Sequence, residues 1–94
     1  MKVEIQFEAQ LRQVAEAPSV QLDLAEGTSL AAGVAQAAEG SAQALRDRLL
    51  ADDGSVRAGL LVFVNDQPVS ADRIPDTALC DGDTVLLLPP ISGG

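Results

Sequence analysis

Residues 81–94, DGDTVLLLPPISGG, carry the strongest fold signal in the sequence. Asp81-Gly82-Asp83 predicts a tight turn, because Asp and Gly accept the backbone angles that turns require. The apolar run from Thr84 to Leu88 then predicts a strand, bounded by that turn and by two prolines that cannot donate a strand hydrogen bond. The pattern therefore predicts a buried last strand that ends just before Pro89.

The segment from Pro89 to Gly94 differs from an ordinary polar tail. Two prolines hold φ near about −65°, which favours a stiff extended start, and at about 3.3 Å per residue the segment would reach roughly 20 Å. Gly93 and Gly94 have no Cβ and would fit a narrow channel. We expect residues 89–94 to project from a single domain of residues 1–94 and to bring the carboxylate of Gly94 into a partner's buried site. The alternative is a glycine end without a role.

Upstream of this strand, the sequence predicts a second buried strand and an edge segment. Leu60 to Val64 is a continuous β-branched and aromatic run, typical of an interior strand. Asn65-Asp66-Gln67 predicts a tight reversal, and Pro68-Val69 an edge segment. Residues 70–77 are expected to form a polar loop.

The first half of the chain predicts two strands followed by helix. Apolar and polar residues alternate over Val3–Phe7 and again over Val20–Leu24, the period of half-buried strands. Thr28 or Ser29 can cap a helix that runs through Ala38. Ser41 can cap a second helical stretch over residues 42–49, so the order is ββ, α, ββ around one core.

Composition narrows the possible functions. The 94 residues are 47% hydrophobic, with mean hydropathy +0.17, which suits one small domain with a core. A formal charge of −8 argues against DNA, RNA and anionic membranes as partners. The sequence has no His and a single cysteine, Cys80, which excludes a histidine-based triad, an internal disulfide and a CxxC pair. We expect a soluble cytoplasmic protein in which Cys80 is a small, buried or half-buried hydrophobe.

Together these motifs resemble the MoaD/ThiS family of ubiquitin-like sulfur carriers, which includes the small subunit of molybdopterin synthase. The residues that carry the resemblance are Val3–Phe7 with Ala9–Arg12, Val64-Asn65-Asp66, Asp81-Gly82-Asp83 and Leu88–Gly94. The resemblance implies an α+β fold, the β-grasp: a mixed sheet of four to five strands packed on one main helix plus short helical segments. It also implies that the first and last strands lie parallel in the centre.

The resemblance further implies that Gly94, with Gly93 before it, carries the chemistry. A ubiquitin-activator-like adenylyltransferase would use ATP to adenylate the Gly94 carboxylate, and a persulfide donor would convert it to a thiocarboxylate. The sulfur would then pass to a pterin precursor in the large subunit of molybdopterin synthase. No cofactor would be bound stably, and the chain would not be catalytic alone. The residues implied to contact these partners are Leu88, Pro89, Pro90, Ile91 and Ser92.

Three alternatives stay open. The stretch Leu45–Val64 also looks like carriers that serve cysteine synthesis and like archaeal small modifiers, and thiamine synthesis is a further possible pathway. A modifier would join Gly94 to target lysines by an isopeptide bond. A β-grasp adaptor would bind a partner through its sheet and leave the C-terminal segment inert.

Overall fold

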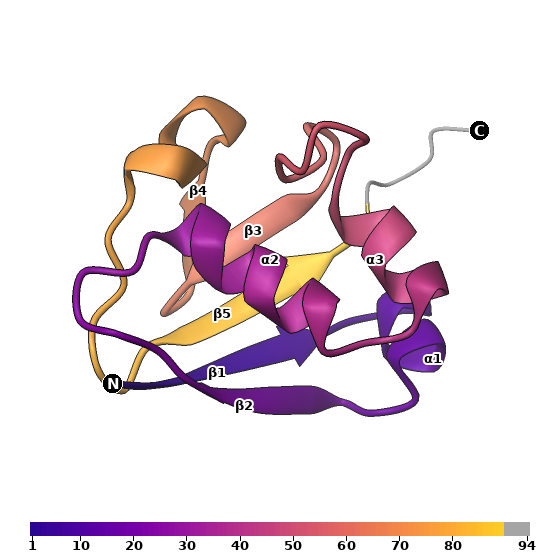
Figure 1. Ribbon diagram of the computed structural model, residues 1–94, viewed down its shortest axis with the longest axis horizontal. Coiled ribbons are helices and arrows are strands. Elements are labelled where there is room, and N and C mark those ends of the chain that lie inside the picture. Colours follow the sequence, from indigo (N-terminus) through magenta and orange to yellow (C-terminus); the bar gives the residue numbers. More distant parts are fainter. Residues whose placement is uncertain (90–94) are drawn as a thin grey trace.

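A five-stranded mixed sheet forms one layer of the molecule, in the strand order β2-β1-β5-β3-β4 (Figure 1). The computed structural model describes residues 1–89. The strands are β1 (Lys2–Phe7), β2 (Ser19–Asp23), β3 (Leu61–Val64), β4 (Gln67–Val69) and β5 (Thr84–Leu88). β1 and β5 are parallel neighbours inside the sheet, and the other neighbouring pairs of these strands are antiparallel. The mixed sheet with a parallel inner pair of first and last strands is therefore confirmed.

The inner pair of strands supplies one face of the core. Ile5 lies opposite Val85 and Phe7 opposite Leu87, and all four side chains are buried. A parallel pair cannot be closed by a tight turn, so the chain must cross over between β1 and β5. The helices lie in that crossover and cover the same face of the sheet (Figure 1).

The main helix is α2 (Leu30–Glu39), and its start shows which residue caps it. The Ser29 hydroxyl accepts a hydrogen bond from the backbone N–H of Ala32 at 3.1 Å. The Thr28 hydroxyl instead donates to the carbonyl of Ala25 at 2.6 Å. Ser29, one of the two predicted candidates, is therefore the cap, and the helix runs one residue past the predicted Ala38 to Glu39, with Gly40 as its C-cap.

Three short helical segments complete the fold: α1 (Gln10–Ala15), α3 (Gln43–Leu49) and the 3-10 helix η1 (Ala71–Asp76). The prediction that residues 70–77 form only a polar loop is wrong. Ile74, in the middle of that segment, is 2% exposed and belongs to the core. The helical turn of η1 directs the Ile74 side chain into the core, while its neighbours stay exposed.

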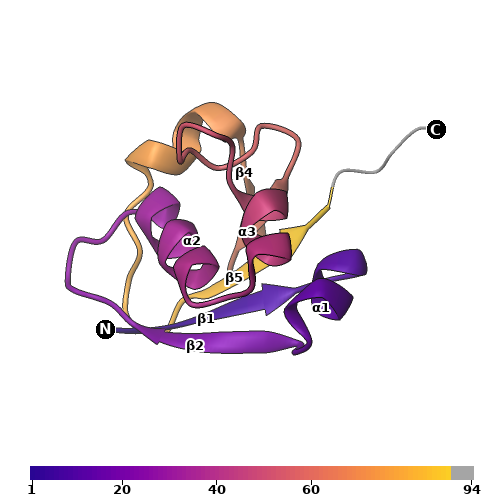
Figure 2. The ribbon, with the colours of Figure 1, turned by 45° about the vertical axis from the view of Figure 1, so that its right-hand side comes forward.

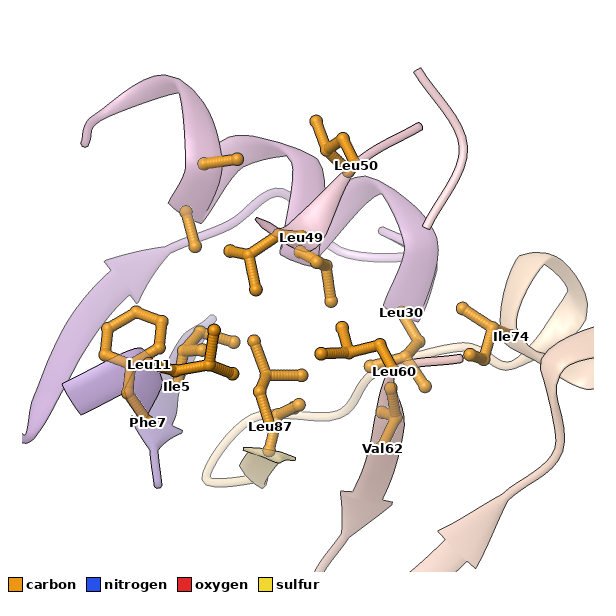
Figure 3. Close-up of a cluster of buried hydrophobic side chains, with 14 of the residues drawn as sticks. Ile5, Phe7, Leu11, Leu30, Leu49, Leu50, Leu60, Val62, Ile74 and Leu87 are labelled. Atoms are coloured by element: carbon orange, nitrogen blue, oxygen red, sulfur yellow. The ribbon is translucent and has the colours of Figure 1, made fainter. Parts of the chain in front are cut away.

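The buried side chains form one cluster between the sheet and the helices (Figure 3). Leu87 of β5 lies among Ile5, Leu60 and Val62, with Leu49 of α3 and Leu30 of α2 above them (Figure 3). No polar or charged side chain of residues 1–89 is buried. Apolar packing therefore stabilises the core, and the polar side chains that make hydrogen bonds lie outside it.

Two further predictions about single side chains are wrong. Ser41 does not cap α3, whose N-cap is Ala42 without a side-chain hydrogen bond; the Ser41 hydroxyl donates to the carbonyl of Ala37 at 2.8 Å and so ends α2. Cys80 is exposed, because it lies in the turn region before β5, where the core residue is its neighbour Leu79.

The β3–β4 reversal is confirmed. Asn65 and Asp66 have φ of 50° and 71°, and Pro68 lies on β4 at the edge of the sheet. Positive φ at both central residues matches the twist of the flanking strands. The Asn65 side chain adds a cross-link, because its amide donates to Asp83 at 2.8 Å and its oxygen accepts from the N–H of Thr84 at 2.9 Å.

Within residues 1–89, no helix is long and apolar enough to cross a membrane.

Candidate functional site

The candidate site begins where β5 ends. Leu88 is the last residue of β5, lies opposite Leu61 of β3 and is half-buried, as is Pro89 after it. The other predicted site residues lie outside the described part of the chain: Pro90, Ile91, Ser92, Gly93 and Gly94. The structure thus places the root of the C-terminal segment.

That root is held on both sides. β5 pairs with β1 along one edge and with β3 along the other, and the N–H of Glu8 donates to the carbonyl of Leu87 at 3.1 Å. Leu87 itself is completely buried. An interior strand with a buried anchor next to its last residue gives residue 89 a fixed starting point and direction.

The turn before β5 uses its carboxylates to hold backbone. Asp81 accepts a hydrogen bond from the N–H of Lys2 at 2.7 Å, and Asp83 accepts one from the N–H of Cys80 at 2.7 Å. Gly82, between them, has φ of 87°, which favours glycine. This confirms the turn interpretation of Asp81-Gly82-Asp83. Among residues 1–89, no three His, Cys, Asp or Glu side chains are arranged to hold a metal ion.

The face of the sheet opposite the helices is partly apolar. Leu61 is 40% exposed, and Phe63, Leu86 and Leu88 are half-buried. Leu61 pairs with Leu88 and Phe63 with Leu86, so these four side chains form a continuous patch across β3 and β5, which we call the outer strip. Its border is polar on the β1 side, where Gln6 lies beside Leu86 and donates to Glu4 at 2.7 Å. An exposed apolar patch with a polar border is typical of a protein interaction site.

Sequence reasoning missed Leu61, Phe63 and Leu86 as candidate site residues. The runs Leu60–Val64 and Thr84–Leu88 were interpreted as fully buried strands, since both are continuously apolar. The structure shows that helices cover only one face, so alternate residues of each run face outward (Figure 1). The sequence contains a signal that could have found them. A continuously apolar strand whose sheet is covered by helices on one face must expose every second apolar side chain on the other face.

One described ionisable group has a shifted pKa. Asp53, in the connection between α3 and β3, accepts hydrogen bonds from the hydroxyl and the backbone N–H of Ser55 at 2.6 and 3.0 Å. These bonds stabilise the carboxylate and lower its pKa below the usual 3.8. The group is fully exposed and lies in a turn, so the shift marks local turn geometry and no catalytic acid.

The end of β5 lies at the same end of the molecule as α1 and α3 (Figure 2). The described part of the candidate site therefore consists of a fixed strand end and an apolar strip on the outer face beside it.

A family model and a curated protein both match this chain. The model of the ThiS family matches residues 5–94, which includes β5 and the whole C-terminal segment. A curated relative, ubiquitin-related modifier 1 from Coprinopsis cinerea, is 39% identical over 49 residues; the match covers 52% of this chain and 40% of that protein.

Two solved structures extend the likeness to the whole fold. The crystal structure of SAMP1 from Haloferax volcanii matches with a TM-score of 0.84 and 28% identity, and covers 100% of both chains. In the crystal structure of the BexX/CysO complex from Amycolatopsis orientalis, the matched chain has a TM-score of 0.73 and 25% identity, and the alignment covers 98% of this chain and 99% of that one. The family match over nearly the whole length and the β-grasp architecture agree, and the chain therefore belongs to the ThiS family of ubiquitin-like sulfur carriers and modifiers.

Proposed function

We propose that this protein is a sulfur carrier whose Gly94 carboxylate is activated and converted to a thiocarboxylate. The observation that supports this most strongly is the continuity of the ThiS family match through β5 to residue 94, on a strand whose end is fixed inside the sheet. A rigid root with a slender segment beyond it can deliver a terminal carboxylate into another protein's active site. Membership of the ThiS family is the reason to expect that the Gly94 carboxylate reacts.

The proposed chemistry needs a partner at each step. A carboxylate is a poor electrophile, so its oxygen first attacks the α-phosphorus of ATP and pyrophosphate leaves. The terminal sulfur of a persulfide then attacks the carbonyl carbon of Gly94 and AMP leaves. A thiol that attacks the adjoining sulfur releases the thiocarboxylate and is itself oxidised to a disulfide. With no His in the chain, the general acids and bases come from the partners.

The outer strip is the proposed contact surface for the activating enzyme, a ubiquitin-activator-like adenylyltransferase. Leu61 and Leu88 lie beside the strand end, so an enzyme that takes up residues 89–94 covers them at the same time. Burial of this apolar area supplies affinity, while the glycines enter the reaction centre.

For the acceptor, we propose the large subunit of molybdopterin synthase, with this chain as the small subunit that gives its sulfur to a cyclic pterin precursor. The support is the resemblance carried by Asp81-Gly82-Asp83 and Leu88–Gly94. An ATP-dependent pathway of this kind, together with an exposed Cys80 thiol that suits reducing conditions, agrees with a cytoplasmic location.

A second function is favoured by a specific observation. Ubiquitin-related modifier 1 and SAMP1, the small archaeal modifier protein 1, are named as modifiers, and this chain is similar to both. Attack by a target lysine on the activated Gly94 would form an isopeptide bond and release AMP. A carrier for cysteine or thiamine synthesis would use the same thiocarboxylate with another acceptor.

The test is an intact mass of the protein purified from its own host without added thiols, with fragmentation of the C-terminal peptide. Exchange of one oxygen for sulfur at Gly94 is the expected result. Unmodified protein together with lysine-linked conjugates would replace the carrier by the modifier, and absence of both would contradict the proposal.

Two variants serve as controls. Deletion of Gly94 and extension by one residue beyond it should each abolish adenylation and leave the melting temperature unchanged, because neither touches the core. A sheet-binding adaptor would retain its partner in both variants.

A further inference from the structure

A cavity of about 300 Å³ opens where the connection between α3 and β3 turns toward the sheet. We call it the arginine cavity, and its lining residues are Arg48, Ala51, Arg57, Ala58, Gly59 and Leu60. Leu60 is 5% exposed and belongs to the core, so the base of the cavity is apolar. Two guanidinium groups line it, and no carboxylate does. Half of the six basic residues of this acidic chain, Arg46, Arg48 and Arg57, lie in this region.

The two arginines have unused hydrogen-bond donors. Arg57 is held in place, because its Nε donates to the carbonyl of Asp47 at 2.6 Å and its backbone N–H donates to the carbonyl of Leu49 at 3.0 Å. A cation at the carboxyl end of α3 is also favourable for the helix dipole. Arg48 is exposed and its guanidinium makes no hydrogen bond or ion pair within residues 1–89. Both groups stay charged at any physiological pH.

The neighbouring cavity provides a contrast. It has a volume of about 220 Å³ and is lined by Arg46 together with the carboxylates Asp47 and Asp52. Two acidic residues that share a cavity with one arginine weaken the attraction of that cavity for an incoming anion. The arginine cavity, lined by two arginines and no acidic residue, therefore favours a negative group more strongly.

The arginine cavity lies next to the root of the C-terminal segment. Leu61, the first residue of β3, is paired with Leu88, and two cavity residues, Gly59 and Leu60, come directly before Leu61 in the chain. Both ribbon views place α3 and the carboxyl end of β5 at one end of the molecule (Figures 1 and 2). A protein that binds the chain beyond Leu88 can therefore contact this cavity at the same time.

We propose that the arginine cavity receives an aspartate or glutamate side chain of the enzyme that activates Gly94. A carboxylate accepts two parallel hydrogen bonds from a guanidinium, and the methylene groups of such a side chain would pack on Ala58 and Leu60. Because the rest of this chain is acidic, its partner surface is expected to be basic; one acidic side chain that meets an arginine pocket then fixes the orientation of the complex. The proposed occupant is a side chain rather than a nucleotide phosphate, because the ATP phosphate must meet the Gly94 carboxylate, and Gly94 lies six residues beyond Leu88 in the sequence.

This proposal rests on the proposed function, and the experiment separates the two. The adenylation rate is measured with the adenylyltransferase of the same genome at saturating ATP, as a function of carrier concentration, for wild type, Arg48→Glu, Arg48→Lys and Arg46→Glu. For Arg48→Glu we expect KM for the carrier to rise about tenfold with kcat unchanged, since the lost contact forms in the encounter and not at Gly94. Arg48→Lys should show a smaller rise, because lysine keeps the charge and loses the bidentate geometry.

Arg46→Glu is the matched control: it places the same charge change on the same helix beside the neighbouring cavity, and its KM should stay within about twofold of wild type. Arg46→Glu and Arg48→Glu should lower the melting temperature by the same few degrees, because Arg46 and Arg48 are both exposed and both lie in the last turn of α3. Wild-type adenylation with an unchanged KM for Arg48→Glu would overturn this inference and leave the proposed function intact. Equal rises in KM for Arg46→Glu and Arg48→Glu would mean that net charge alone causes the effect, and would also overturn this inference. No adenylation of wild type would overturn the proposed function. Binding of ATP to the carrier alone, lost in Arg48→Glu, would assign the cavity to a nucleotide and refute the side-chain proposal.

Discussion

Leu87 and Leu88 are neighbours on β5 that face opposite sides of the sheet. The same substitution should therefore lower the stability at Leu87 and weaken enzyme binding at Leu88. Leu87 is 0% exposed and lies in the core between β1 and β3, whereas Leu88 is half-buried in the outer strip. Both substitutions to alanine change strand propensity equally. Any difference between them therefore reports burial and contacts.

The expected magnitudes follow from that burial. Leu87→Ala removes a fully buried isobutyl group and leaves a cavity whose walls are strands and helices, which costs about 3 kcal/mol of the free energy of unfolding. For a domain of this size that loss lowers the melting temperature by roughly 12–24 °C. Leu88→Ala removes a group that is partly in water already, and costs about 1 kcal/mol or less.

The assay has two readouts on the same samples: urea unfolding followed by far-ultraviolet circular dichroism, and KM for the carrier in adenylation. We expect Leu87→Ala to lose stability and, while folded, to keep its KM. Leu88→Ala should keep its stability and raise KM several-fold, because the activating enzyme loses part of the outer strip. Equal loss of stability in both variants would refute the assignment of the two faces, and an unchanged KM for Leu88→Ala would refute the outer strip as the enzyme's contact surface.

Three further predictions test local features of the fold. Ser29→Ala removes the cap of α2 and should cost about 1 kcal/mol in thermal unfolding; no measurable change would contradict the capping role. Asn65→Gly should destabilise less than Asn65→Ala in urea unfolding, because glycine accepts a φ of 50° while both substitutions lose the bonds to Asp83 and the β5 backbone; the reverse order would mean that backbone conformation is unimportant there. Ser55→Ala removes the hydroxyl bond and keeps the backbone N–H bond, so it should raise the pKa of Asp53 toward its ordinary value in a carboxyl-carbon NMR titration; an unmoved pKa would exclude the hydroxyl bond as the main cause. Because the folded pKa is depressed, these bonds stabilise the fold above the ordinary pKa of 3.8, and their contribution is lost as the pH falls through the lowered value.

Local patterns in the sequence were sufficient for the strands, turns and main helix. β5 has the predicted bounds, Thr84 to Leu88, because a glycine turn and a proline pair delimit an apolar run. β1 and β2 follow from period-two alternation, and the Asn65-Asp66 turn follows from the few residue types that accept positive φ. These features depend on interactions between near neighbours in the chain.

The parallel pairing of β1 with β5 was expected only from the family resemblance, and other features that depend on distant residues were predicted wrongly or missed. The 3-10 helix η1 exists because Ile74 reaches a core built by other segments. Cys80 is exposed because its neighbour Leu79 fills the available place in the core. No local pattern states which of two adjacent residues the core will accept.

Composition and contacts within a few residues are enough to predict the order of strands and helices, the acidic character and the chemistry available to the chain. The packing of distant segments sets which half of each apolar run faces outward and brings Arg48 and Arg57 to one cavity near the end of β5. Helices cover one face of the sheet, so apolar side chains on its other face stay partly exposed. Which face is covered depends on how the crossover between β1 and β5 packs, and that packing joins residues far apart in the chain.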